Sequence, residues 1–245
     1  MIMARRFVLI CLFFTCPVSA QQLVFAYGPG NGAPFAIVNG QQLTGGLFKD
    51  IGDALSAHSK LDVVYRQVPT KRASSLLISG EINALCLTHP DWIEGHEQLF
   101  WSPVLTQDFD HLMTLKKEPL HVKAFSDIQN LNVGAMTGYI YFPKLMDLFA
   151  QGKANRRDFN NLEALYASLF AERLHAVVDS RISIYYRQKT QARYRQLQVS
   201  NLVVYQYDLY CAFNNSLLPV KEKIIDALAA MMRGGEFDKI IKRYQ

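Results

Sequence analysis

Apolar and polar positions follow two different periods along this chain. Short apolar runs, typical of buried strands, alternate with longer stretches in which apolar residues recur every three or four positions, as on one face of a helix. In the first part of the chain the predicted elements are a strand over 23–27, a helix over 47–58, a strand over 63–67, a helix over 71–79 and a strand over 84–87. Strands that alternate with helices pair in parallel, because each right-handed crossover returns over a helix. The pattern therefore predicts an α/β fold.

The second part of the chain shows the same alternation. The predicted elements are strands over 112–115, 132–135, 176–178 and the long stretch 202–213, helices over 143–151, 162–170, 181–187 and 219–233, and an amphipathic last turn over 236–244. The sequence contains no low-complexity tract, long linker or internal repeat between the two series. Two such series without a linker predict two lobes joined by crossing strands.

The N-terminal segment is typical of a secretory signal peptide. A positive region with Arg5 and Arg6 precedes a short apolar region and a small-residue cleavage site that ends at Ala20. We therefore predict a signal peptide over 1–20 and a periplasmic location for the mature chain. An uncleaved N-terminal anchor is the alternative, although the apolar region is short for a bilayer span.

Composition and charge narrow the function classes. Of the 245 residues, 50% are hydrophobic and 19% are charged, which excludes a disordered chain. Removal of 1–20 takes away two arginines and leaves 24 basic and 21 acidic residues, so the net charge falls from +5 to +3. The basic residues are scattered rather than gathered in one stripe, and no nucleic-acid partner is predicted.

Cysteine and histidine usage gives no metal or catalytic motif. The six histidines lack metal-ligand spacing, and the chain contains no G-x-S-x-G, H-E-x-x-H or phosphate-binding glycine loop. No catalytic residue, metal or cofactor is therefore predicted. Cys86 and Cys211 remain in the predicted mature chain. They are either buried thiols or a disulfide, since the sequence does not give their separation.

Seven short stretches lie in an order that is typical of one protein family. They are 33–37 (APFAI), 46–51 (GLFKDI), 76–84 (LLISGEINA), 100–103 (FWSP), 131–138 (LNVGAMTG), 175–179 (HAVVD) and 234–244 (GGEFDKIIKRY). Together they resemble the family 3 extracellular solute-binding proteins, the polar-amino-acid group of type II periplasmic binding proteins. The resemblance covers nearly the whole predicted mature chain.

This resemblance implies a two-lobed fold, in which each lobe is a mainly parallel sheet flanked by helices and two hinge strands cross between them. Lobe 1 would comprise 22–107 plus 209–245, and lobe 2 would comprise 110–206, with the hinge near 106–110 and 206–209. A small polar ligand, of the amino acid or organic acid class, would bind between the lobes. An inner-membrane permease for ABC-type uptake, or a sensor ectodomain, would read the closed form. A dehydratase-like enzyme on the same fold is a further alternative.

At the ligand site the sequence departs from the family. The family clamps a ligand carboxylate with an Arg shortly after the third strand, but 89–95 contains no Arg or Lys and Trp92 stands at that position. The family's amino-acid specificity is therefore not carried over. Arg72 is the best substitute cation, with a surface charge as its alternative. Asp179 would hold an ammonium group, with a helix N-cap as its alternative.

The remaining candidate ligand-binding residues come from strand ends and turns. Aromatic walls of the cleft are predicted at Tyr27, Phe35 and Trp92, hydrogen-bonding groups at Thr88 and His89, and an oxygen-binding turn at Thr137, Gly138 and Tyr139. Burial in the core is the alternative for the aromatic residues, and a simple tight turn is the alternative for 137–139.

Overall fold

The computed structural model describes residues 22–28, 31–117 and 119–245. The predicted signal peptide lies outside these residues. Nine strands form a continuous sheet in the order β4-β1-β5-β11-β7-β10-β8-β9, with β6 paired to β11, and a separate two-stranded hairpin lies beside it. Within the described residues, no helix is long and apolar enough to cross a bilayer.

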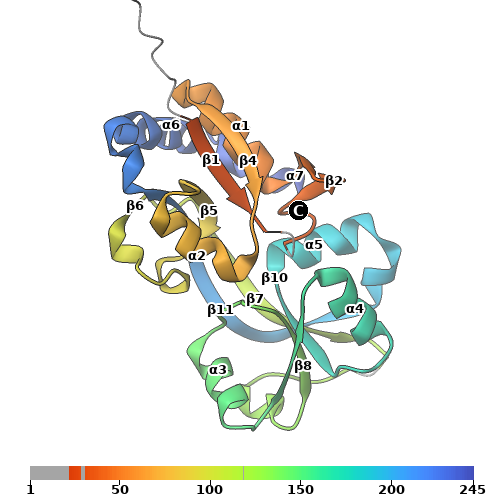
Figure 1. Ribbon diagram of the computed structural model, residues 1–245. Helices are drawn as coiled ribbons and strands as arrows, with labels where there is room; N and C mark the ends of the chain where they lie inside the picture. Colours follow the sequence, from red (N-terminus) through yellow and green to blue (C-terminus); the bar gives the residue numbers. More distant parts are fainter. Residues whose placement is uncertain (1–21, 29–30, 118) are drawn as a thin grey trace, which may run out of the picture.

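One part of the sheet is built from both ends of the chain. Its strands are β1 (Gln22–Tyr27), β4 (Asp62–Gln67), β5 (Ala84–Thr88) and β6 (Leu99–Trp101), and its helices are α1 (Leu47–Ser59), α2 (Thr70–Ser79), α6 (Lys221–Arg233) and α7 (Glu236–Arg243). Strand β1 runs parallel to both β4 and β5. The hairpin of β2 (Ile37–Asn39) and β3 (Gln42–Gly45) belongs to this part, which occupies the upper half of Figure 1.

The other part comes from the middle of the chain. Its strands are β8 (Asn132–Met136), β9 (Asn155–Phe159) and β10 (Ala176–Ser180), and its helices are α3 (Pro143–Ala150), α4 (Leu162–Phe170) and α5 (Arg181–Thr190). Strand β8 pairs in parallel with β9 and β10. Each part has its own buried apolar clusters, so the chain contains two cores.

Two long strands connect the parts. Strand β7 (Thr106–Leu115) pairs antiparallel with β11 (Leu197–Asn214), and both run from the upper to the lower half of Figure 1. The segments predicted as the hinge lie opposite each other in this pairing, with Thr106 facing Leu209 and Asp108 facing Tyr207. Their role as a hinge, and the predicted lobe boundaries, stay predictions.

Most predicted helices and strands are present, but several observed strands were not predicted. The sequence pattern did not predict β6, β9 or the β2–β3 hairpin, and of β7 it predicted only 112–115. Strand β9 has the sequence NRRDF, and most of its residues are exposed at the edge of the sheet. Such strands carry no apolar run or clean alternation, so periodicity does not reveal them.

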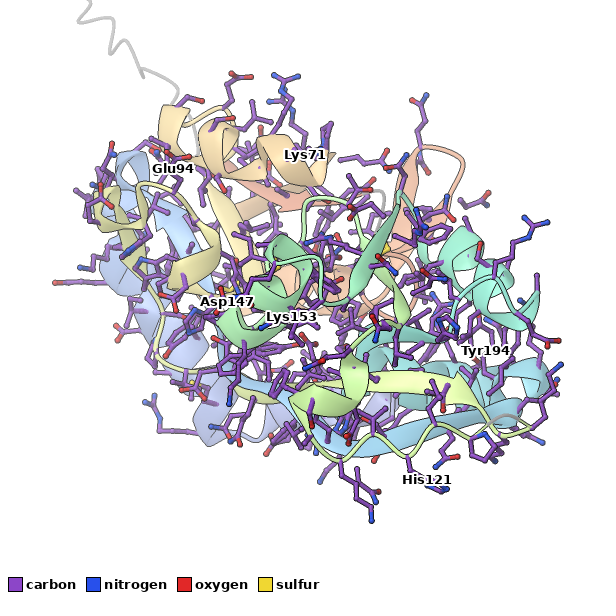
Figure 2. All side chains as sticks on the ribbon, turned by 90° about the horizontal axis from the view of Figure 1, so that it is seen from below. Lys71, Glu94, His121, Asp147, Lys153 and Tyr194 are labelled. Atoms are coloured by element: carbon purple, nitrogen blue, oxygen red, sulfur yellow. A yellow bond between two sulfur atoms is a disulfide. The ribbon has the colours of Figure 1, made fainter. Side chains whose placement is uncertain are left out.

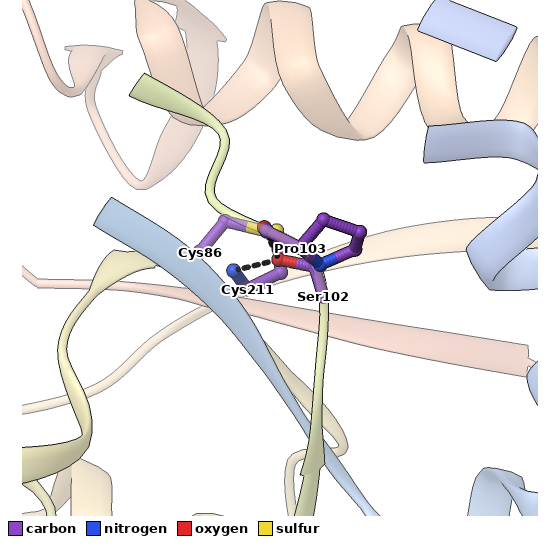
Figure 3. Close-up of a disulfide and its surroundings, with 4 residues drawn as sticks. All are labelled: Cys86, Ser102, Pro103 and Cys211. Carbon is purple, nitrogen blue, oxygen red and sulfur yellow. Dashed lines mark hydrogen bonds between the residues drawn. A yellow bond between two sulfur atoms is a disulfide. The ribbon is translucent and has the colours of Figure 1, made fainter. Parts of the chain in front are cut away.

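Cys86 and Cys211 form a disulfide between neighbouring strands β5 and β11. Figure 3 shows the bond beside Ser102, whose hydroxyl oxygen accepts a hydrogen bond from the Cys211 amide at 2.9 Å. The sequence left two alternatives for these cysteines, buried thiols or a disulfide, and the structure shows the disulfide. It links two segments 125 residues apart and ties the C-terminal part of the chain to the third strand.

Loss of this disulfide should lower the stability of the mature chain. Because the closed loop is long, replacement of both Cys86 and Cys211 by alanine is expected to reduce the free energy of unfolding by about 2–4 kcal/mol. Urea unfolding with and without reductant measures the difference. Reductant should destabilise the unaltered protein and leave the double variant unchanged, and equal unfolding midpoints for the two proteins would show that the bond contributes nothing.

Candidate functional site

A cleft of about 630 Å³ lies between the two parts of the molecule. This volume is within the usual range for small-molecule sites. Seven predicted ligand-binding residues line it: Tyr27, Phe35, Thr88, Trp92, Gly138, Tyr139 and Asp179. The structure thus brings together most of the candidates at one place, and their contact with a ligand stays a prediction.

Arg72 does not line the cleft. It lies on the exposed face of α2, whereas its neighbour Lys71 is among the lining residues. Successive residues on a helix point about 100° apart, so the first turn of α2 presents Thr70, Lys71 and Ser74 to the cleft and directs Arg72 away. The placement corresponds to the alternative of a surface charge. Figure 2 labels Lys71 and also Glu94, another lining residue.

His89 and Thr137 also lie outside the cleft lining. The His89 ring packs behind Trp92, with ring centroids 5.6 Å apart, and its Nδ1 accepts a hydrogen bond from the Asp91 amide. His89 therefore supports the loop that carries Trp92 and Asp91. The Thr137 amide donates to the carbonyl of Phe159 and continues the pairing of β8 with β9.

Contacts across the cleft join the two parts. The Asn31 side-chain amide donates to the Tyr139 hydroxyl at 2.8 Å, and Arg187 donates to the carbonyl of Ala33 at 3.4 Å. Gly138, with a φ of 81°, lies against Lys71, where an added Cβ would come within 3.0 Å of the Lys71 side chain. The structure is therefore a closed arrangement, in which the loop after β1 and the start of α2 meet the turn after β8.

Asp179 is occupied by contacts within its own part of the molecule. Its Oδ2 accepts hydrogen bonds from the hydroxyls of Tyr166 (2.7 Å) and Ser183 (2.8 Å), and its Oδ1 accepts one from the Ser180 amide. Burial raises the pKa of Asp179, while the nearby charge of Arg187 and these hydrogen bonds oppose the rise. The N-cap of α5 is Ser180, whose side chain accepts from the Ser183 amide. Asp179 is therefore not the cap, and its partners leave it a weaker candidate for holding an ammonium group.

Arg187 is a buried cation that the sequence did not single out. The residue is 1% exposed, and its guanidinium lies between the rings of Tyr166 and Tyr194, at 5.4 Å and 5.3 Å from their centroids. Its guanidinium donates to the Tyr194 hydroxyl and lies 3.5 Å from a carboxylate oxygen of Glu163. These partners make Arg187 a structural group beside the cleft rather than part of its lining.

Two carboxyl groups of the crossing strand β7 line the floor of the cleft. Asp108 and Asp110 are two positions apart and therefore share one face of the strand. The Asp108 Oδ1 accepts from the amides of Phe109 and Ile182, and Asp110 accepts from the Tyr207 hydroxyl at 2.9 Å. No described group forms a hydrogen bond with the buried Asp108 Oδ2.

Burial changes the acidity of both groups. Loss of solvent raises the pKa of Asp108 to about 6, against the amide hydrogen bonds, the Ser180 hydroxyl and the charge of Arg181, which lower it. Loss of solvent also raises the pKa of Asp110 to about 8. The hydrogen bond from Tyr207 lowers that pKa, and the charges of Asp108 and Asp179 raise it further. The apo cleft therefore disfavours ionised carboxylates.

Sequence reasoning missed Asp108 and Asp110 because it searched strand ends and loops. A signal was present: two aspartates at a spacing of two, directly before the apolar run 112–115, mark one face of a strand that enters a core. Sequence reasoning also missed Asn31, because a single polar residue in a loop rich in glycine and proline gives no signal of a ligand site. Among the described residues, no group of His, Cys, Asp and Glu side chains could hold a metal ion.

The backbone is irregular at the end of β5, where Thr88 lines the cleft. The pairing of β5 with β11 shifts between Tyr210 and Cys211, and Leu87 has a φ of 52°, in the left-handed region. Such a conformation costs about 1–3 kcal/mol for a residue other than glycine. The shift places Thr88 opposite Tyr210 at the end of β5, where Thr88 lines the cleft.

Comparisons with known proteins identify the fold. No protein-family model matches the sequence, and no curated protein is similar enough to match it. Among solved structures, the chain is similar to the GluR0 ligand-binding core in complex with L-glutamate (TM-score 0.76, 17% identity, covering 92% of this chain and 99% of that one). An amino acid ABC transporter substrate-binding protein of Streptococcus pneumoniae bound to L-arginine gives a TM-score of 0.73 at 18% identity, covering 91% and 94% of the two chains.

A third similar structure is an ancestral amino acid-binding protein described as a precursor of cyclohexadienyl dehydratase. It gives a TM-score of 0.74 at 16% identity and covers 91% of this chain and 95% of that one. All three structures are described as binding an amino acid or as bound to one. The chain therefore has the two-lobed type II periplasmic binding protein fold, and the predicted fold class is confirmed.

The raised pKa values of Asp108 and Asp110 predict how the stability of the protein depends on pH. The folded state holds protons on Asp108 and Asp110 up to about pH 6 and pH 8, whereas in the unfolded chain both groups ionise near pH 4. This contribution to stability is complete below about pH 4 and is lost as pH rises through the folded values, by up to about 1.4 kcal/mol per pH unit and group. The melting temperature of the apo protein should therefore fall between pH 5 and pH 8.

The variant Asp110→Asn should flatten this slope, because an amide does not ionise. Melting curves at pH 5, 6, 7 and 8 make the comparison, with Asp226→Asn on the exposed face of α6 as the matched control. If Asp110→Asn and Asp226→Asn showed the same slope as the unaltered protein, Asp110 would ionise as an ordinary carboxyl.

Proposed function

We propose that this chain is a periplasmic solute-binding protein that captures a small polar ligand between its two lobes, for ABC-type uptake. The observation that supports the proposal most strongly is the cleft itself. It lies where two separate cores meet, is crossed by two paired strands, and is lined by Asp108, whose buried Oδ2 has no hydrogen-bond partner among the described residues. Small-molecule sites combine such a concave, partly aromatic wall with a few convergent polar groups.

The predicted location and partner follow from this role. The signal peptide pattern over 1–20 and the disulfide between Cys86 and Cys211 both suit an oxidising compartment outside the cytoplasm. An inner-membrane permease would then receive the ligand from the closed form. The ectodomain of a receptor or kinase is an alternative partner, because it would read the same closed form.

A second candidate function is a dehydratase-like enzyme. Carboxyl groups with raised pKa values in a cleft suit proton transfer, and Asp110 has the raised pKa that a general acid needs at neutral pH. One similar structure is described as a precursor of a dehydratase, which makes this chemistry compatible with the fold. A binding protein returns its ligand unchanged, whereas an enzyme converts it, and this difference separates the two functions.

A thermal-shift screen of residues 21–245 tests the proposed function. A ligand that binds only the folded state raises the melting temperature, by about 5–10 °C at a concentration of 100 Kd for a chain of this size. We expect one chemical class among amino acids, organic acids, sugars, amines and short peptides to give such a shift. The bound compound should be recovered unchanged by NMR after incubation. Absence of any shift, or conversion of the compound, would contradict the proposal.

Lys71 and Arg72 offer a matched pair of neighbouring cations. Lys71→Ala should change the affinity of a charged ligand about tenfold, because Lys71 lines the cleft, whereas Arg72→Ala should change it less than twofold. Weaker binding by Lys71→Ala indicates an anionic ligand, and tighter binding indicates a cationic one. Isothermal titration calorimetry on both variants measures the change in affinity. A larger change with Arg72→Ala than with Lys71→Ala would contradict the prediction that Lys71 is the cation near the ligand.

A further inference from the structure

Acidic side chains outnumber basic ones in the lining of the cleft. Among its described lining residues one is basic, Lys71, and five are acidic: Asp91, Glu94, Asp108, Asp110 and Asp179. A ligand carboxylate would therefore meet one ammonium group and several carboxylates. Burial raises the pKa of Asp108 and Asp110, and a bound cation would lower it again and favour the ionised carboxylates.

The inner end of this acidic lining contains an acceptor without a partner. Asp108 is 1% exposed, and no described group donates a hydrogen bond to its Oδ2 atom. A buried carboxylate oxygen in this state costs free energy until a donor satisfies it. Asp110, two positions along the same strand face, adds a second carboxyl group at this end.

The protein's own arginines do not satisfy this acceptor. The guanidinium of Arg181 stacks on the Phe109 ring at 4.3 Å, and its charge lowers the pKa of Asp108 without a hydrogen bond to Oδ2. Arg187 is engaged by Tyr194, Glu163 and the carbonyl of Ala33. Neither arginine lines the cleft, whereas Asp108 does, and its Oδ2 is available to a donor on a bound ligand.

Aromatic rings connect the inner acidic end to the outer one. The rings of Trp92 and Tyr207 lie 5.0 Å apart, and those of Tyr207 and Tyr205 lie 5.1 Å apart. Tyr207 donates a hydrogen bond to Asp110, and Trp92 follows Asp91 in the chain, so these two lining rings adjoin the two acidic ends. Aromatic faces accept alkyl chains and attract ammonium groups.

We propose that the ligand is a small organic dication of the diamine class. One ammonium group donates to Asp108 and Asp110 at the floor of the cleft. The alkyl chain packs along Trp92 and Tyr207, and the second ammonium group lies near the exposed carboxylates of Asp91 and Glu94. This inference rests on the proposed function and specifies its ligand.

Calorimetry with residues 21–245 tests the ligand class directly. The compounds are 1,4-diaminobutane and 1,5-diaminopentane, with 1-aminobutane as a matched monocation and L-arginine and L-glutamate as amino acids. We expect a diamine to bind at least tenfold more tightly than 1-aminobutane, and more tightly than either amino acid. The monoamine comparison isolates the second charge at nearly constant apolar surface.

Variants test the two ends separately. Asp108→Asn should weaken diamine binding at least tenfold, whereas Asp226→Asn on the exposed face of α6 should leave it unchanged. If Asp108→Asn does not fold, the double variant Asp91→Asn/Glu94→Gln alters only exposed side chains and serves instead. It should weaken binding of the diamine several-fold and leave that of the monoamine unchanged.

The outcomes separate this inference from the proposed function. Tight binding of an amino acid or an organic anion without diamine binding would overturn the inference and leave the solute-binding function intact. Diamine binding that survives Asp108→Asn and the double variant at full affinity would also overturn it. No binding of any compound here or in the broader screen would count against both.

Discussion

The antiparallel pairing of β7 with β11 is the constraint on which the rest of the structure depends. It aligns segments about a hundred residues apart, so that Asp110 and Tyr207 meet at 2.9 Å. The same two strands continue into the sheets of both parts, and they place their polar face on the floor of the cleft. Without this pairing the two cores would share no common wall, and Asp108 and Asp110 would be solvated carboxylates with ordinary acidity.

Desolvation is the dominant electrostatic effect at this site. Loss of solvent is the largest cause of the raised pKa of Asp108, Asp110 and Asp179. Asp179 is compensated by three hydrogen bonds and by Arg187, whereas Asp108 keeps one oxygen without a donor. This difference shifts the expected point of ligand contact from the end of β10 to the crossing strand.

The periodicity of the sequence predicted most of the fold because the amphipathic elements have one buried face. Helix α1 follows the 3.6-residue pattern, strands β1 and β5 are short and largely buried apolar runs, and the left-handed Gly80 ends α2 as expected. The loops after β1, β5 and β8 were also identified, since strand ends in α/β folds form ligand crevices. Edge strand β9 and the β2–β3 hairpin escaped because their residues have little apolar pattern to read.

Other features of the site depend on contacts between distant segments. The first turn of α2 contains two adjacent cations, and only its rotation against the cleft distinguishes Lys71 from Arg72. The disulfide required the register that places Cys86 opposite Cys211. By itself the sequence determined the α/β class, the order of the elements and the loops around a crevice, because local periodicity encodes these. The tertiary structure alone decided which charges face the cleft and which carboxyls lose their solvent, because burial and proximity arise only when distant strands pair.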